Sequence, residues 1–193
     1  MRLPTLRSKR LIGAGSLACA GLAAAAVSLA VTTFPAAAAT AAVPACTSSQ
    51  LVVWLNSSGS GTAGATYYAI QFTNIAQTSC SMIGYPGVSG LSHSGAQLGA
   101  SATRNAAHKS CSITLAGSTK SSSLSNPAIG ILKITDAGNY PKAKCGPVTA
   151  SALRVYPPGL KSSSVVPFPF LACSKSGAPY LSIEAVEGGV AAA

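Results

Sequence analysis

Few side chains in this sequence could take part in catalysis. The 193 residues include three carboxylates, Asp136, Glu184 and Glu187, and two histidines, His93 and His108. A glycosidase pair would have to come from those carboxylates. However, Glu184 alternates with apolar strand residues and Glu187 begins a glycine-rich tail, so both are expected in solvent. No serine stands in a GxSxG or SxxK pattern. We therefore expect no enzyme, and Asp136 and the two histidines are the residues worth testing.

A glycine string could suggest a dinucleotide site. Gly59, Gly61 and Gly64 match the pattern GxGxxG. A dinucleotide site needs a helix after the glycines and an acidic residue about twenty positions further on. The next element here, Thr66 to Asn74, has the pattern of a strand, and no acidic residue follows at that distance. We expect a flexible hairpin loop over Asn56 to Ala65 and no cofactor.

The cysteines predict two disulfides. Residues that pair across an antiparallel hairpin have numbers that sum to a constant. Cys46 and Cys80 are centred on residue 63, inside the glycine-rich loop, and Cys145 and Cys173 are centred on Gly159, inside another turn. Each bridge would tie the outer ends of one hairpin and contribute roughly 3 to 4 kcal/mol in the chain-entropy model.

A competing pair remains open at this point. Cys80 and Cys111 are centred on Gly95, in a third turn-like stretch. Cys111 shares its period-two phase with Ile113 and Leu115, which would point its side chain into the core. We expect Cys111 to be a free, buried thiol. No CxxC spacing or cluster of histidine and cysteine predicts a zinc site.

The N-terminus predicts export. Four basic residues within the first ten precede 21 uncharged residues, Leu11 to Val31, and then the alanines of residues 36–39. This is the pattern of a signal peptide, expected over residues 1–39 with cleavage near residues 38 to 42. An uncleaved signal anchor is the alternative, because the apolar run could just span a bilayer. With cleavage we expect a protein that is secreted or associated with the cell wall and has no stable membrane span.

The charge of the predicted mature chain is moderate. Removing the four N-terminal basic residues leaves nine against three carboxylates, a net charge of about +6. Such a charge attracts anionic polymers, although it also serves solubility alone. Apart from the close pair Lys142 and Lys144, the basic residues are scattered singly. We expect no nucleic-acid partner; an anionic cell-wall polymer or another exported protein is the candidate partner.

Beyond the signal the pattern is that of β-structure. Apolar residues alternate or cluster in short runs between Gly, Pro, Ser and Asn, which predicts a two-sheet sandwich, with a barrel as the alternative. Pro167 and Pro169 place their strand at a sheet edge. Residues 188–193 are expected to form a flexible tail. The predicted strands are Gln50 to Leu55, Thr66 to Asn74, Ser81 to Gly84, Gly87 to Leu91, Cys111 to Leu115, Ala128 to Thr135, Ala152 to Tyr156, Val165 to Leu171 and Tyr180 to Val186.

Two aromatic residues have alternative interpretations. Trp54 and Tyr67 could form an aromatic platform for a glycan. We favour Trp54 as a core residue opposite the first disulfide, because large aromatic side chains usually fill cores.

An ordered set of motifs resembles a known family. The motifs are Cys46 to Leu51, YYAIQFTN at Tyr67 to Asn74, Cys80 followed by GYPGV at Gly84 to Val88, Asn139 to Pro141 with Cys145, and LRVYPPG at Leu153 to Gly159. Together they are similar to the domain of unknown function 4232 family. The resemblance implies an exported, immunoglobulin-like sandwich of high-GC Gram-positive bacteria, here a single domain over residues 46–187. It also implies cysteines at positions 46, 80, 145 and 173, but no activity and no functional residue.

These observations favour a non-catalytic module that is extracellular or associated with the cell envelope. Two alternatives stay open. One is an enzyme, or an accessory to one, that acts on cell-wall glycan. The other is a secreted spacer domain without a specific ligand.

Overall fold

The computed structural model describes residues 42–107, 109–118 and 126–189. The predicted signal peptide and His108 lie outside these ranges, as does most of the predicted tail. Within them no helix is both long and apolar enough to cross a membrane. The elements are β1 (Leu51–Thr62), β2 (Ala65–Asn74), β3 (Cys80–Met82), β4 (Gly87–Leu91), β5 (Gln97–Leu98), β6 (Thr103–Asn105), β7 (Ile113–Leu115), β8 (Ala128–Thr135), β9 (Pro147–Tyr156), β10 (Ser164–Cys173), β11 (Leu181–Glu184) and β12 (Glu187–Gly188), with η1 (Ser48–Gln50), η2 (Ala137–Asn139) and α1 (Lys142–Cys145).

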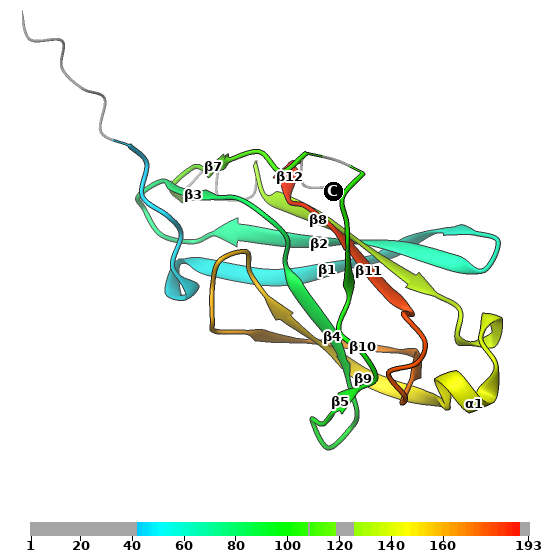
Figure 1. The fold of residues 1–193 in the computed structure, drawn as a ribbon. Coiled ribbons are helices and arrows are strands. Elements are labelled where there is room, and N and C mark those ends of the chain that lie inside the picture. The colour runs from blue at the N-terminus through cyan, green and yellow to red at the C-terminus, as the bar shows by residue number, and fades with distance from the viewer. Residues whose placement is uncertain (1–41, 108, 119–125, 190–193) are drawn as a thin grey trace, which may run out of the picture. The chain divides into compact units, whose positions relative to one another are not determined.

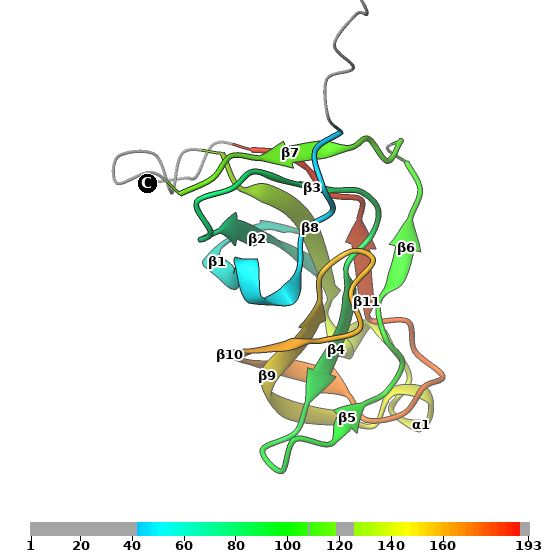
Figure 2. The same ribbon diagram turned by 90° about the vertical axis from the view of Figure 1, so that its left-hand side faces the viewer.

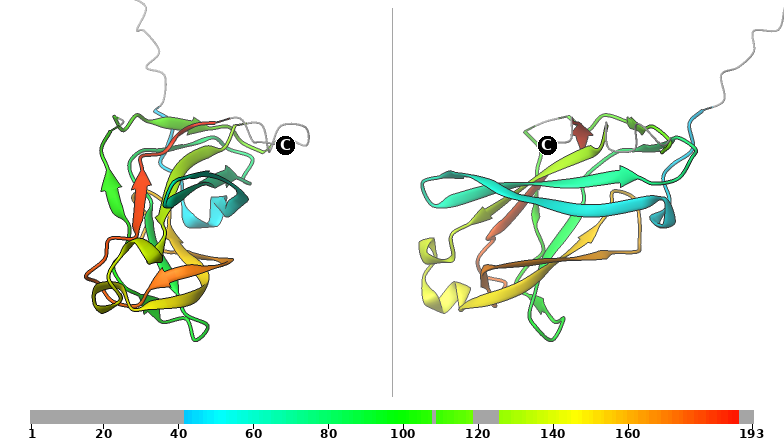
Figure 3. Two further views of the ribbon diagram at one scale, coloured as in Figure 1. Left: turned by 90° about the vertical axis from the view of Figure 1, so that its right-hand side faces the viewer. Right: turned by 180° about the vertical axis from the view of Figure 1, so that it is seen from behind.

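The strands form two packed layers, which confirms the predicted all-β sandwich. The larger sheet has the order β1-β2-β8-β11-β6, and the second sheet has the order β10-β9-β4-β5. Neighbouring strands are antiparallel except β11 and β6, which are parallel. Figure 1 and the right-hand view of Figure 3 show β1 and β2 in one layer and β9 and β10 in the other. β3 and β7 pair separately at one end of the sandwich.

The core lies between the two layers. Along β8 the residues alternate between buried and half-buried, as expected for a strand with one face on the core. Phe72 and Leu132 from the larger sheet are fully buried, as are Leu153 and Val155 from the second. Burial of each such side chain stabilises the fold by roughly 1.5 to 3 kcal/mol. The bounds predicted for β4 and β8 agree with the structure, because turn-forming residues flank both runs.

The predicted glycine-rich loop is instead part of a strand. β1 continues to Thr62, with an irregularity in its pairing with β2 between Asn56 and Ser60. A side chain at Gly59 would lie 2.6 Å from the ring of Tyr68, and Gly64 in the turn has a positive φ of 79°. The glycines therefore admit an aromatic ring and a tight turn, rather than making the segment a loop. The long cyan hairpin of Figure 1 is this pair of strands.

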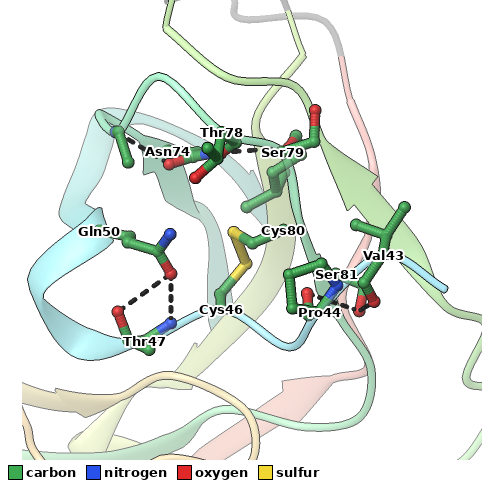
Figure 4. Close-up of a disulfide and its surroundings, with 12 residues drawn as sticks. Val43, Pro44, Cys46, Thr47, Gln50, Asn74, Thr78, Ser79, Cys80 and Ser81 are labelled. Atoms are coloured by element: carbon green, nitrogen blue, oxygen red, sulfur yellow. Dashed lines mark hydrogen bonds between the residues drawn. A yellow bond between two sulfur atoms is a disulfide. The ribbon is translucent and has the colours of Figure 1, made fainter. Parts of the chain in front are cut away.

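The first disulfide joins Cys46 to Cys80. It does not lie within the β1–β2 ladder, whose last pair at this end is Leu51 with Asn74. Beyond that pair the chain turns through η1, and the N–H of Cys46 donates to the carbonyl oxygen of Ser81 at 2.9 Å. Figure 4 shows the bridge between these two segments. The symmetry of the hairpin therefore predicts the correct pair of cysteines, although the two cysteines lie beyond the last pair of the ladder.

The second disulfide joins Cys145 to Cys173. Cys145 ends α1, and Cys173 ends β10, where it pairs with Pro147 of β9. Gly146 turns the chain between α1 and β9 with a positive φ of 56°. The N–H of Ser174 donates to the carbonyl oxygen of Gly146 at 3.0 Å. Both bridges therefore tie the outer ends of hairpins.

Cys111 is a free cysteine, but the prediction that it is buried is wrong. Its side chain is exposed. β7 begins at Ile113, so the alternation of that strand does not extend back to residue 111. The alternative partner, Cys80, faces Leu115 across β3 and β7 and is bonded to Cys46.

Of two predictions about the edges of the sandwich, one is confirmed and one is wrong. β10 is the outermost strand of its sheet, and its pairing with β9 is interrupted between Pro167 and Phe170. The edge position predicted from the prolines is therefore confirmed. The predicted tail, however, starts too early, because Glu187 and Gly188 form β12 and pair with β8.

A buried asparagine at the end of β2 connects the following turn to the end of β7. The side-chain amide of Asn74 donates to the carbonyl oxygens of Thr78 at 2.8 Å, Ala116 at 3.1 Å and Leu115 at 3.4 Å. Replacing a buried group of this kind leaves its partners unpaired. We expect Asn74→Ala to lower the free energy of unfolding by about 2 to 4 kcal/mol in urea denaturation. Asn56→Ala is the control with a cost below about 1 kcal/mol, since Asn56 makes one exposed contact. Equal losses in the two variants would contradict this assignment.

Because of Tyr180, we expect the stability of the fold to fall with rising pH in the alkaline range. Its side chain is fully buried, and its hydroxyl donates to the carbonyl oxygen of Leu98 at 2.9 Å. Burial raises the pKa of Tyr180 to about 12, an effect that the Gly90 backbone partly opposes. The pKa of Tyr180 is higher in the folded state than the unfolded value near 10, so the folded state favours the neutral phenol. The contribution of this phenol to stability is therefore complete below pH 10 and is lost between pH 10 and about 12.

We expect the free energy of unfolding to fall by about 1 kcal/mol more in the wild type than in Tyr180→Phe between pH 9 and pH 11. Urea denaturation of both proteins at the two pH values measures the difference. Parallel pH curves would show that the phenol of Tyr180 does not cause the loss.

Candidate functional site

The most polar cavity described lies on the outer face of the larger sheet. Strand register places four side chains in one row across this face. Tyr67 of β2 pairs with Lys133 of β8, and Lys133 pairs with Ser182 of β11. Ser182 in turn pairs with Thr103 of β6. Figure 2 shows β8, β11 and β6 side by side in this order. Because successive side chains of a strand alternate between faces, the row points away from the core.

We call the cavity around this row the outer groove. It has a volume of about 480 Å³. Tyr140 contributes from the end of η2 and Pro179 from the loop before β11, and the Tyr140 hydroxyl donates to the carbonyl oxygen of Pro179 at 3.0 Å. The residues that line the groove are Tyr67, Arg104, Asn105, Ile131, Lys133, Thr135, Tyr140, Pro179, Ser182 and Glu184.

The outer groove brings a cation, an aromatic ring and a carboxylate together. The Lys133 ammonium lies 5.8 Å from the centre of the Tyr67 ring, within the range of a cation–π contact. The Asn105 side-chain amide donates to Glu184 Oε1 at 3.0 Å. Arg104 also lines the groove, although its pairing with Ile183 places its guanidinium carbon 5.6 Å from the ring centre of Tyr85. Lys133 is the cation that lies beside Tyr67 in the groove.

These groups suit a polyhydroxylated ligand with acidic substituents. A tyrosine ring offers an apolar face, and hydroxyl, amide and carboxylate groups offer both donors and acceptors. The ammonium of Lys133 would favour a ligand with negative charge. All ten lining residues come from ordered strands and their adjoining loops, so the arrangement needs no large rearrangement to receive a ligand.

The sequence-predicted catalytic candidates are not brought together here. Asp136 caps η2 and lines a different cavity. His93 is exposed in the turn between β4 and β5, and His108 lies outside the described residues. Glu184 faces outward as expected but is half-buried against Asn105, while Glu187 is exposed in β12. Among the described residues no group of three metal-ligating side chains occurs.

The prediction that Trp54 fills the core is wrong. Trp54 is half-buried on the outer face of β1, where its indole N–H donates to Thr73 Oγ1 at 3.3 Å. The neighbours Val53 and Leu55 pack on the core instead, because alternation places them on the inner face. Trp54 pairs with Gln71, on the same face as Tyr67 but four residues further along β2. Trp54 and Tyr67 therefore share a face, but the outer groove contains Tyr67 alone of the two.

Sequence reasoning missed Lys133, Ser182 and Asn105. The alternation of β8 and β11 shows that Lys133 and Ser182 point outward. It does not show that the two strands are neighbours, or that the short strand β6 lies beside them. That information is carried by the sheet order.

Comparison with known protein families matches residues 46–187 to the domain of unknown function DUF4232. No curated protein and no solved structure matches the chain significantly.

A buried glutamine on the outer face gives a stability test. Gln71 is 1% exposed, and its Oε1 has no hydrogen-bond partner among the residues that the structure describes. An unpaired buried acceptor destabilises a fold by about 1 to 3 kcal/mol. We expect Gln71→Met to raise the free energy of unfolding by about 1 kcal/mol or more in urea denaturation, since it removes the acceptor at similar length. Gln77→Met, at an exposed glutamine, should leave stability unchanged. A less stable Gln71→Met protein would mean that the amide is needed.

Proposed function

We propose that this chain, which belongs to the DUF4232 family of domains of unknown function, is an exported, non-catalytic module that binds an anionic polymer of the cell envelope through the outer groove. The observation that carries the proposal is the row formed by Tyr67, Lys133 and Ser182 across three neighbouring strands. It presents a ring, an ammonium group and a hydroxyl on one solvent-facing surface.

The chemistry of the groove favours a glycan-type polymer. The ring of Tyr67 can stack on the apolar face of a sugar, while Lys133 can pair with a phosphate or carboxylate on the same chain. The Asn105–Glu184 pair supplies donors and acceptors for hydroxyl groups. The groove is open, so a polymer can cross it without its ends having to enter.

Two further observations support the exported, non-catalytic character. The two disulfides are typical of proteins that fold in an oxidising compartment, in agreement with the predicted signal peptide. Hydrolysis of a glycan usually needs two carboxyl groups on either side of one bond. Asp136 and Glu184 instead line separate cavities.

Binding to isolated walls tests the proposal. We expect the exported protein to co-sediment saturably with purified Gram-positive cell walls, and to remain bound at about 0.5 M salt, where screening acts within a few ångströms. Tyr67→Ala and Lys133→Met should each weaken binding by about tenfold, equivalent to about 1.4 kcal/mol. Lys161→Met is the matched control, because it removes the same charge from an exposed turn.

Other results would direct the search elsewhere. If binding disappears in salt, or if Lys161→Met weakens it as much as Lys133→Met, the attraction is the general positive charge and a spacer role is favoured. If the protein does not bind to walls at all, another exported protein is the next partner to test. Release of soluble glycan fragments from the walls would contradict the non-catalytic assignment.

A further inference from the structure

A second cavity opens at the seam between the two sheets. We call it the seam cleft. It has a volume of about 320 Å³ and lies between the tip of the β1–β2 hairpin, η2 and the edge strand β10. It shares no lining residue with the outer groove. The residues that line the seam cleft are Thr62, Gly64, Ala65, Thr66, Tyr68, Ile134, Asp136, Phe170 and Leu171.

Half-buried aromatic rings form one side of the seam cleft. Tyr68 and Phe168 meet edge to face, with ring centres 4.8 Å apart. Phe168 stacks on Phe170 with centres 5.7 Å apart. Tyr68 comes from the inner face of β2 and the two phenylalanines come from β10, and all three pack against the edge of the core. Tyr68 and Phe170 line the cleft, and Phe168 lies between them. Aromatic faces carry partial negative charge and attract cations.

Asp136 supplies the full negative charge of the cleft. Its backbone N–H donates to the carbonyl oxygen of Gly64 at 2.9 Å, and the Asn139 side-chain amide donates to the same oxygen at 2.8 Å. These two bonds fix η2 to the tip of the β1–β2 hairpin. Asp136 Oδ1 accepts a hydrogen bond from the N–H of Gly138 at 2.9 Å, so the carboxylate is held in one orientation.

The charge at this position is unusual for the chain. The sequence has 13 basic residues and only three acidic ones. Even so, the residues that line the seam cleft in the described part of the chain include no lysine, arginine or histidine. Asp136 is exposed, and the one hydrogen bond described for its carboxylate comes from a neutral backbone N–H. The cleft thus combines an oriented carboxylate with aromatic walls and lacks a cation of its own.

We propose that the seam cleft binds a primary ammonium group at the end of an aliphatic chain, as in the side chain of a lysine or another diamino acid in a peptide. Asp136 would pair with the ammonium group. Tyr68 and Phe170 would contact both the ammonium and the methylene groups next to it. This site takes a ligand of the opposite charge from that of the outer groove, and it does not depend on the function proposed for that groove.

A small probe tests the site directly. We expect Nα-acetyl-lysine methylamide, titrated into the ¹⁵N-labelled exported protein, to shift the backbone amide signals of Gly64, Thr66 and Gly138 and to saturate at millimolar concentration. The Nε-acetylated form of the same compound, which lacks the charge, should bind at least tenfold more weakly. Loss of saturable shifts with the charged probe, or equal shifts with both probes, would overturn the proposal.

Variants separate the cleft from general attraction of cations to carboxylates. Asp136→Asn keeps an oxygen for the Gly138 N–H and should weaken binding at least tenfold. Glu187→Gln, which makes the same charge change on exposed β12, should bind as the wild type does. If Asp136→Asn disturbs η2, seen as a shift of the Asn139 signals without ligand, Phe170→Leu provides the second test and should weaken binding severalfold. Unchanged affinity in Phe170→Leu, or an equal effect of Glu187→Gln, would assign the shifts to surface charge.

Discussion

The register between β2 and β8 is the constraint on which the rest of the structure depends. The ladder runs from Ala65 opposite Thr135 to Phe72 opposite Ala128 and lies inside the larger sheet. It places Tyr68 beside Leu132 on the inner face and Tyr67 beside Lys133 on the outer face. A slip of one residue would turn Lys133 toward the core and Leu132 toward solvent, at a large cost in free energy. The outer groove and the core are thus set by the same pairing.

The ends of the sandwich are closed by groups that lie beyond the ladders. Cys46 and Cys80 connect segments past the last pair of β1 and β2, and Asn74 holds the adjoining turn to the segment after β7. At the other end, the carbonyl of Gly64 accepts from both Asp136 and Asn139. These contacts hold the loops, and in the second case they fix η2, whose Gly138 N–H orients the carboxylate of the seam cleft. Loop structure and the candidate binding chemistry are therefore coupled.

Local patterns in the sequence predicted the bounds of single strands better than they predicted which strands lie side by side in a sheet. The clean alternation of residues 128–135 gave the bounds of β8, and Pro167 and Pro169 placed β10 at an edge. The glycines of β1 were misleading, because their role is to admit the Tyr68 ring and to form the turn at Gly64. Trp54 was misplaced because residue size outweighed the alternation of β1 in the prediction. The groove itself was not predictable, since it needs the order β2-β8-β11-β6, in which β8 joins strands far apart in the sequence and β6 has three residues.

The position of Trp54 has a consequence for spectroscopy. It is the one tryptophan of the chain, and it lies on the outer face of β1 beside Thr73. Indole emission from this protein therefore comes from a single place, at an edge strand of the larger sheet. Its wavelength reports whether β1 remains paired with β2, and it carries no direct signal from β9, β10 or the second disulfide. Emission and far-ultraviolet circular dichroism would coincide during unfolding if both sheets separate together, and would diverge if β1 leaves first.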